Sequence, residues 1–320
     1  MRILSGIQPS GKLHLGNYFG MMRPALELQK KGQAFLFIAN YHALTTVTDP
    51  QALRQDTIEV ALDFLACGLD PEATIFYRQS DVPEVTELAW LLSVVTPMGL
   101  LERCHSYKDK IARGIAPSHG LFAYPVLMAA DILACQSNVV PVGQDQKQHV
   151  EVTRDIAIKF NNQYGPVFTI PEPAIQDAVA IVPGLDGRKM SKSYDNHIEL
   201  FGSPKETKAR VMRIVTDSTP LEAPKDPDAC TVFALYRLLV SPPEAEAMAA
   251  SLRQGGYGYG EAKKALLAAV TAYLEPFRRK REELARDPAH VEAILRRGAE
   301  RARAEARLTL AAARKAVGLD

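Results

Sequence analysis

Apolar and polar positions alternate in a regular way along the first 182 residues. Continuous apolar runs are typical of parallel strands covered on both faces, and apolar residues three or four apart are typical of helices. The runs predict strands over 3–7, 34–39, 74–77, 137–141 and 179–182. The stretches between them predict helices over 21–30, 49–67, 81–95, 124–135 and 142–162. This alternation predicts an α/β fold with a doubly wound parallel sheet.

The pattern changes after residue 190. Amphipathic stretches without a strand signal predict helices over 203–214, 229–240, 243–254, 260–285 and 287–317. We therefore predict a sheet-containing part over residues 1–190 and a helical part over 191–320, whose last helix could pack back on the sheet. Within the first part, residues 104–119 are polar and rich in Lys, Arg and Gly, and they predict a flexible connective insertion over the site.

Composition narrows the function classes. The 320 residues are enough for two domains, and 38 Lys and Arg against 37 Asp and Glu give a formal charge of +1, which does not by itself indicate nucleic acid. Four cysteines without a C-x-x-C pair exclude an obvious zinc or iron–sulfur site and favour reduced thiols in a cytoplasmic protein. We find no signal peptide and no apolar run long enough for a membrane span.

Residues 6–20, with the sequence GIQPSGKLHLGNYFG, form a glycine-rich turn between the first strand and the first helix. Such a turn binds phosphate, because free N–H groups and the helix dipole attract an anion. Its start matches the G-x-x-x-x-G-K pattern of a P-loop, but Leu13 stands where that motif needs a hydroxyl for magnesium. His14 and Asn17 can instead donate hydrogen bonds to phosphate, and Gly16 leaves room for a nucleotide base.

A second motif, Lys189-Met190-Ser191-Lys192-Ser193, follows a glycine-containing turn at 184–187. Two ammonium groups and two hydroxyls on a loop can close over a triphosphate as charge builds on the departing pyrophosphate. Taken alone, such a lysine pair would be interpreted as a solvated basic turn. Its position after the first motif, with a nucleotide-fold span between the two, favours the phosphate role.

His14-Leu15-Gly16-Asn17 and residues 189–193 resemble the HIGH and KMSKS signatures of class I aminoacyl-tRNA synthetases, and Gln8-Pro9-Ser10-Gly11 resembles their tryptophanyl branch. The resemblance covers nearly the whole chain. It implies a Rossmann-like fold with a C-terminal helical region that binds the tRNA anticodon. It also implies a ligase that activates L-tryptophan with ATP to tryptophanyl-adenylate and pyrophosphate, then transfers tryptophan to the 3′ terminal adenosine of tRNA(Trp).

The resemblance also implies partners and site residues. We expect a homodimer, ATP as substrate, and Mg²⁺ carried with ATP rather than held by protein ligands. Catalysis is expected from Lys189, Lys192, His14, Asn17 and Lys110, although Lys110 could equally be an exposed loop lysine. The expected ATP contacts are Gln8, Pro9, Ser10, Gly16, Asn17, Gly143, Gln144, Asp145, Val182, Lys189, Met190, Ser191, Lys192 and Ser193.

The predicted helix 124–135 carries a single carboxylate, Asp131, which is unfavourable in apolar surroundings unless it has a partner. That partner is either structural, such as an arginine, or a ligand; the resemblance implies that Asp131 accepts the indole N–H of tryptophan. His42, after the 34–39 strand, is either a substrate contact or a structural histidine. The expected tryptophan contacts are Asp131, Tyr124, Met128, His42, Gln146, Val140, Val142 and Gln8.

The last 50 residues are basic, with twelve Lys or Arg against eight Asp or Glu. Neighbours such as Glu300 and Glu305 explain part of this pattern, and contacts with tRNA phosphates would explain the excess. The basic surface comprises residues 278–281, Arg296, Arg297, Arg301, Arg303 and Arg307.

Three other functions compete with this interpretation. A tyrosyl synthetase would share the fold and both motifs. A P-loop NTPase is disfavoured by Leu13. A non-catalytic RNA-binding relative would be expected to have lost His14, Asn17 or the 189–193 loop, and all are present.

Overall fold

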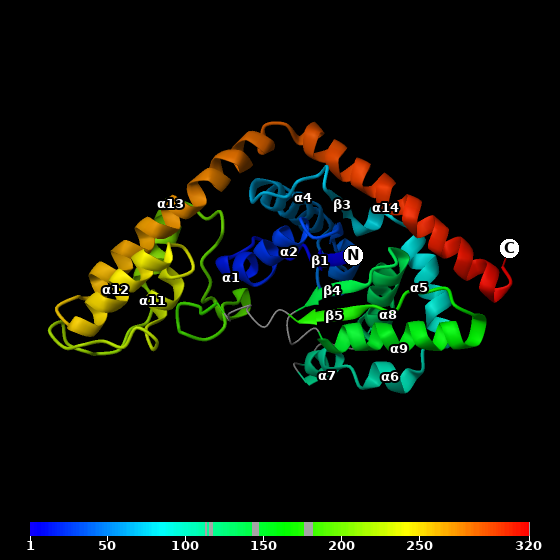
Figure 1. The fold of residues 1–320 in the computed structure, drawn as a ribbon, viewed down its shortest axis with the longest axis horizontal. Helices are drawn as coiled ribbons and strands as arrows, with labels where there is room; N and C mark the ends of the chain where they lie inside the picture. The colour runs from blue at the N-terminus through cyan, green and yellow to red at the C-terminus, as the bar shows by residue number, and fades with distance from the viewer. Residues whose placement is uncertain (113, 115–117, 143–146, 176–181, 320) are drawn as a thin grey trace.

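The computed structural model describes residues 1–112, 114, 118–142, 147–175 and 182–319. This part of the chain contains a five-stranded parallel sheet with the order β3-β2-β1-β4-β5 (Figure 1). The strands are β1 (Arg2–Ile7), β2 (Gln33–Ile38), β3 (Thr74–Arg78), β4 (Val139–Val142) and β5 (Glu172–Ile175).

The first four predicted strands are confirmed, and β5 was not predicted. Prolines at positions 171 and 173 obscure its signal, although proline is tolerated on an edge strand. The strand predicted at 179–182 lies outside the described residues, apart from Val182.

The sheet has a hydrophobic core on each face. Leu36, Ile38 and Phe76 pack in one core with α4 (Pro50–Ala66). Phe35 and Ile75 pack in the other with α5 (Glu84–Val95), α8 (His119–Ala134) and α9 (Lys147–Tyr164). Burial on both faces accounts for the continuous apolar strands and confirms the doubly wound α/β fold.

Two helices begin earlier than predicted because of their caps. The first begins at Leu15 rather than near residue 21, as α1 (Leu15–Asn17), a π-helical turn (Tyr18–Met22) and α2 (Arg23–Leu28). Helix α8 begins at His119, where the Ser118 hydroxyl accepts a hydrogen bond from the Leu121 N–H. We had predicted Pro125 in the first turn of this helix, but the earlier start places it inside α8.

The segment 104–119 is also more ordered in secondary structure than we predicted. It contains α7 (His105–Ala112), which follows α6 (Met98–Glu102). The other short elements are α3 (Asn40–Ala43) and 3₁₀ turns at Gln79–Asp81 and Lys192–Tyr194. The prediction of a loop throughout residues 104–119 is therefore wrong.

The five predicted C-terminal helices are confirmed. They are α10 (Pro204–Met212), α11 (Thr231–Tyr236), α12 (Pro242–Gln254), α13 (Tyr259–Ala285) and α14 (Pro288–Val317). Helices α13 and α14 form the two legs of an inverted V, and α14 runs back to β3 and α5 (Figure 1). No helix in the described ranges is both long and apolar enough to cross a membrane.

Helix α14 crosses the edge of the sheet at β3. Val291 and Leu295 belong to one core, whereas Ala302 and Leu310 belong to the other. Gly298 lies at the crossing, where a Cβ atom would sit only 1.8 Å from the carbonyl oxygen of Phe76. Helix α14 thus covers the edge strand β3 at very close range. This last helix therefore packs with the sheet-containing part.

Many of the predicted tRNA-binding arginines of α14 are engaged within the chain instead. Arg297 donates to Glu72, and both Arg303 and Arg307 donate to Glu84 at 2.9 Å. Arg301 donates to backbone carbonyls between Pro71 and Thr74. These partners lie more than 200 positions away in the sequence, so neighbouring glutamates could not reveal them. Arg297 and Arg307 nevertheless stay 50% and 62% exposed, so the binding of tRNA phosphates by this surface stays a prediction.

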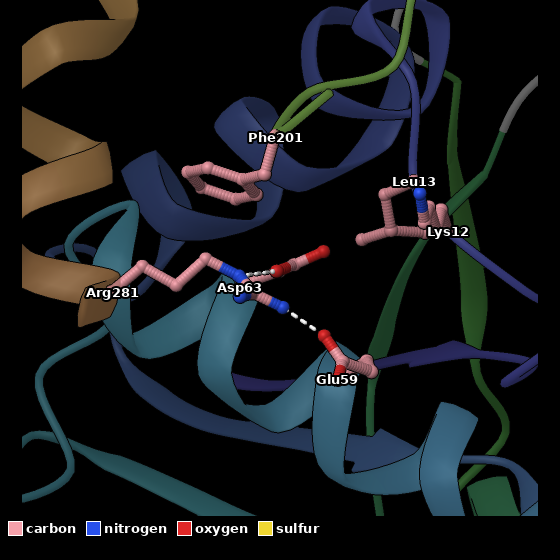
Figure 2. A pocket seen from close by; sticks show the side chains of 6 residues that line it. All are labelled: Lys12, Leu13, Glu59, Asp63, Phe201 and Arg281. Carbon is pink, nitrogen blue, oxygen red and sulfur yellow. Dashed lines mark hydrogen bonds and ion pairs between the residues drawn. The ribbon is translucent and has the colours of Figure 1, made fainter. Parts of the chain in front are cut away.

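Helix α13 is attached to α4 by a partly buried ion-pair cluster (Figure 2). Arg281 donates to Asp63 at 2.6 Å and also to Glu59, and its guanidinium lies 5.1 Å from the ring centre of Phe201. Burial raises the pKa of the Asp63 carboxyl to about 6, and Arg281 opposes that rise. The cluster lines a hollow next to Lys12, so it joins the helical part to the sheet beside the glycine-rich turn.

Candidate active site

The glycine-rich turn ends in a capping box made by His14 and Asn17. The Nδ1 atom of His14 accepts a hydrogen bond from the Asn17 N–H at 3.2 Å, and the Asn17 Oδ1 accepts one from the His14 N–H at 3.1 Å. These two acceptors close the first turn of the helix. The Nε2–H of His14 and the amide N–H groups of Asn17 remain as donors, so the predicted phosphate-binding groups are pre-oriented.

The His14 ring is only 6% exposed and lies 5.8 Å from the ring of His197. Burial, together with repulsion from His197 and Lys192, lowers the pKa of His14 to about 4. His14 is therefore neutral near pH 7. Because Nδ1 accepts a hydrogen bond, the proton resides on Nε2.

We expect the His14 ring to stay neutral from about pH 8 to about pH 5 and to titrate near pH 4. The folded state then binds fewer protons than the unfolded state between pH 4 and 6.5. His14 therefore contributes stability that is fully present above pH 6.5 and lost as the pH falls toward 4. Two-dimensional NMR of ¹⁵N-histidine, with a His14→Asn variant for assignment, measures both tautomer and pKa. Titration near pH 6.5 would contradict this expectation.

The 189–193 loop is held against the glycine-rich turn. The Met190 side chain is buried, and its sulfur lies 3.3 Å from the Gly16 N–H. Asn196, which sequence reasoning missed, accepts from the Ser191 N–H and donates to Asp186 and to the Lys189 carbonyl. No local pattern marks Asn196, since its partners are defined by the fold of the loop. The buried Met190 side chain thus fixes the loop against the glycine-rich turn.

Lys192 connects the two motifs. Its ammonium donates to the Ser10 carbonyl at 2.5 Å, and burial lowers its pKa. Backbone bonds from Leu15 to Ile198 and from Leu200 to Leu13 pair the glycine-rich turn with the segment that follows the second motif. The structure therefore brings together residues that are 182 positions apart. Lys189 is exposed, as are Gln8, Ser10 and Ser193.

A buried polar network lies at the carboxyl ends of β2 and β3. The Asp131 carboxylate accepts from Nε2 of His42 at 2.9 Å and from Nε2 of Gln79 at 2.8 and 2.9 Å. All three side chains are buried. Asp131 thus has structural partners, a histidine and an amide rather than an arginine. Gln79 was missed by sequence reasoning, although its place directly after a buried strand was a usable signal.

Of the other predicted pocket residues that the structure describes, Tyr124 contacts this network. Tyr124 hydrogen-bonds His149 at 3.1 Å, and its ring packs edge-on against His42 at 6.2 Å. His149, expected to be a surface or packing residue, is buried. Met128 is half-buried on α8, and Val140 belongs to the core of the sheet.

Several predicted site residues lie outside the described part of the chain. They are Gly143, Gln144, Asp145, Gln146 and the side chains of Lys110 and Val142. Among the residues that are described, no group of three or more His, Cys, Asp or Glu side chains could hold a metal ion.

Comparison with known proteins agrees with this geometry. The family model described as tRNA synthetases class I (W and Y) matches residues 1–275. The tryptophan–tRNA ligase of Rhodopirellula baltica is 54% identical over 319 residues, which cover both chains completely.

Solved structures are similar over the same extent. The tryptophanyl-tRNA synthetase of Campylobacter jejuni, crystallised with ADP and tryptophan, is 50% identical with a TM-score of 0.95, and the match covers all of both chains. The enzyme of Mycoplasma pneumoniae is 32% identical with a TM-score of 0.84, covering all of this chain and 98% of that one. The chain therefore belongs to the class I tRNA synthetases of the tryptophan and tyrosine group.

Proposed function

We propose that this chain is a tryptophan–tRNA ligase, which forms tryptophanyl-adenylate from L-tryptophan and ATP and then esterifies the terminal adenosine of tRNA(Trp). Full-length relatives at 50% identity or more that carry this name support tryptophan over tyrosine. The observation that carries the assignment is the Lys192 ammonium on the Ser10 carbonyl, since it holds a cation against the glycine-rich turn.

In the first step, the tryptophan carboxylate attacks the α-phosphate of ATP, and pyrophosphate departs. No side chain acts as a covalent nucleophile, so the protein aligns the reactants and stabilises developing charge. His14 Nε2–H and the Asn17 amide donate to phosphate oxygens from the helix N-terminus. Lys192 and Lys189, with Lys110, neutralise the pyrophosphate as it leaves.

Recognition of tryptophan is assigned to the network at the ends of β2 and β3. Asp131 accepts the indole N–H, Tyr124 and Gln146 face the amino and carboxylate end, and Met128 lines the ring. Support comes from the burial of Asp131 within reach of His42. An unpaired buried acceptor penalises side chains that cannot donate, so phenylalanine is rejected.

Magnesium is proposed to arrive with ATP, held mainly by phosphates and water. We place the enzyme in the cytoplasm, where ATP and tRNA are available, and assign anticodon binding to the helical region after residue 190. Exposed lysines on α10, such as Lys205 and Lys208, support phosphate contacts there.

Amino-acid-dependent ATP–pyrophosphate exchange tests the activity directly. Tryptophan is expected to drive exchange, and tyrosine or phenylalanine at least about 1000-fold less efficiently. Exchange that depends on tyrosine instead, or ATP hydrolysis without any amino acid, would contradict the proposal.

A homodimer is also proposed, formed through the exposed apolar face of α5. Trp90 and Val94, four residues apart, are 70% and 64% exposed, and Met98 in the following helix is 63% exposed. Neighbouring apolar groups of this size mark an interface, and a two-fold axis would bury the same face of both copies.

Replacing Trp90 with lysine is expected to convert the dimer to monomer, because the charge would have to be buried in that interface. Size-exclusion chromatography with light scattering measures the mass. The matched control is Leu308→Lys, which alters an isolated apolar side chain that is 71% exposed on α14 and should leave the dimer intact. A monomeric wild-type protein, or a Trp90→Lys dimer, would exclude this interface.

A further inference from the structure

One buried side chain to which the proposed reaction assigns no role, Gln79, joins the two elements of the tryptophan pocket. Its Oε1 accepts from the backbone N–H groups of Tyr41 at 3.0 Å and His42 at 3.4 Å, both in α3. Its Nε2 donates to both oxygens of Asp131 in α8. Gln79 has no measurable exposure, so water does not compete for these bonds.

The orientation of this amide is determined by its neighbours. With oxygen and nitrogen exchanged, the NH₂ group would face two backbone donors and the carbonyl would face a carboxylate. Both contacts would be repulsive, so the oxygen must point to α3 and the nitrogen to Asp131. The position of α3, which carries His42, therefore determines where Gln79 holds the Asp131 carboxylate.

We propose that Gln79 is a positioning residue that determines specificity for the indole N–H. This inference rests on the proposed role of Asp131. A carboxylate offers about four lone-pair sites, of which Gln79 occupies one on each oxygen and His42 occupies one on Oδ2. One site on Oδ1 remains. Because three hydrogen bonds from two donor groups prevent the carboxylate from rotating, that site accepts only from a ligand N–H in one place.

A neighbouring contact provides a matched control. Ser80 joins the turn at Gln79–Asp81 to α3 through Asn40. The Ser80 N–H donates to Asn40 Oδ1 at 3.0 Å, and the Asn40 amide donates to the Ser80 hydroxyl at 2.8 Å. The Ser80 contacts do not reach Asp131. Ser80→Ala therefore weakens the link between this turn and α3 without releasing the Asp131 carboxylate.

The test compares tryptophan with benzothienylalanine, in which sulfur replaces the indole N–H, by pyrophosphate exchange. For the wild type we expect kcat/KM to favour tryptophan by about 100-fold or more. Gln79→Met is expected to reduce this ratio below about tenfold, mainly by raising KM for tryptophan while leaving the analogue nearly unaffected. Ser80→Ala should keep the wild-type ratio.

Two further variants make the test decisive. Asp131→Leu should lose the ratio, and adding Gln79→Met to it should change the ratio by less than about twofold, because both act through one acceptor. Gln79→Leu removes the same donor with a side chain that carries no proton to share with Asp131, so it should also lose the ratio. If Gln79→Met does not fold, Gln79→Leu decides.

The outcomes separate the claims. No tryptophan-dependent exchange by the wild type would overturn the proposed function. Retention of the ratio by Asp131→Leu would leave the enzyme intact but remove Asp131 as the acceptor, and the role of Gln79 with it. Loss of the ratio in Asp131→Leu together with its retention in folded Gln79 variants would overturn this inference alone.

Discussion

Replacing Lys192 with alanine is expected to lower kcat for tryptophan-dependent pyrophosphate exchange by about 100- to 1000-fold, with little change in KM for tryptophan. The ammonium of Lys192 lies against the glycine-rich turn and is partly removed from water, where a charge stabilises departing phosphate strongly. We expect its loss to affect the transition state more than the bound amino acid, because most of the proposed tryptophan contacts belong to the network at the ends of β2 and β3.

The control for this prediction is Lys12→Ala. Lys12 lies in the same turn, but its side chain is 69% exposed and forms an ion pair with Glu199 at 3.1 Å. Exposed ion pairs contribute little, so we expect less than about a threefold change in kcat. Equal losses in both variants would indicate a general effect of positive charge and would contradict the specific role of Lys192.

Replacing Gly298 with alanine is expected to destabilise the protein by about 3 kcal/mol. Within a helix this change is normally stabilising by about 0.5–1 kcal/mol, since alanine loses less backbone freedom on folding. Here the new Cβ would meet the Phe76 carbonyl oxygen at 1.8 Å, so α14 would have to move away from β3. The displaced helix would also disturb the Arg303 contacts with Glu84.

Urea unfolding measures this difference, with Gly260→Ala as the matched control. Gly260 is also helical, in the first turn of α13, and has no atom within 4 Å of an added Cβ. We expect Gly260→Ala to be neutral or slightly stabilising. If Gly298→Ala were as stable as the wild type, α14 would not approach β3 as closely as the structure shows.

Local sequence signals predicted most of the fold. The strands β1 to β3 and the helices α10 to α14 follow from apolar spacing alone, because each element buries a face with the period of its own backbone. Boundaries failed where a cap decided them: α8 begins at His119 because Ser118 caps it, and the histidine of the first motif caps α1. The site residues assigned by motif stay predictions, and part of them lies outside the described residues.

The sequence could not predict which distant side chains form hydrogen bonds and ion pairs with one another. The bond from Gln79 to Asp131 joins residues 52 positions apart, and that from Arg303 to Glu84 joins residues 219 apart. Side-chain periodicity reports which face an element buries, but not which distant group meets it there. For that reason the sequence by itself determined most of the elements, though not β5 or α7, together with the two motifs and the class of chemistry that they indicate. Only the tertiary structure decided that Lys192 meets Ser10, that the α14 arginines hold the helix to the sheet, and that Gln79 holds Asp131.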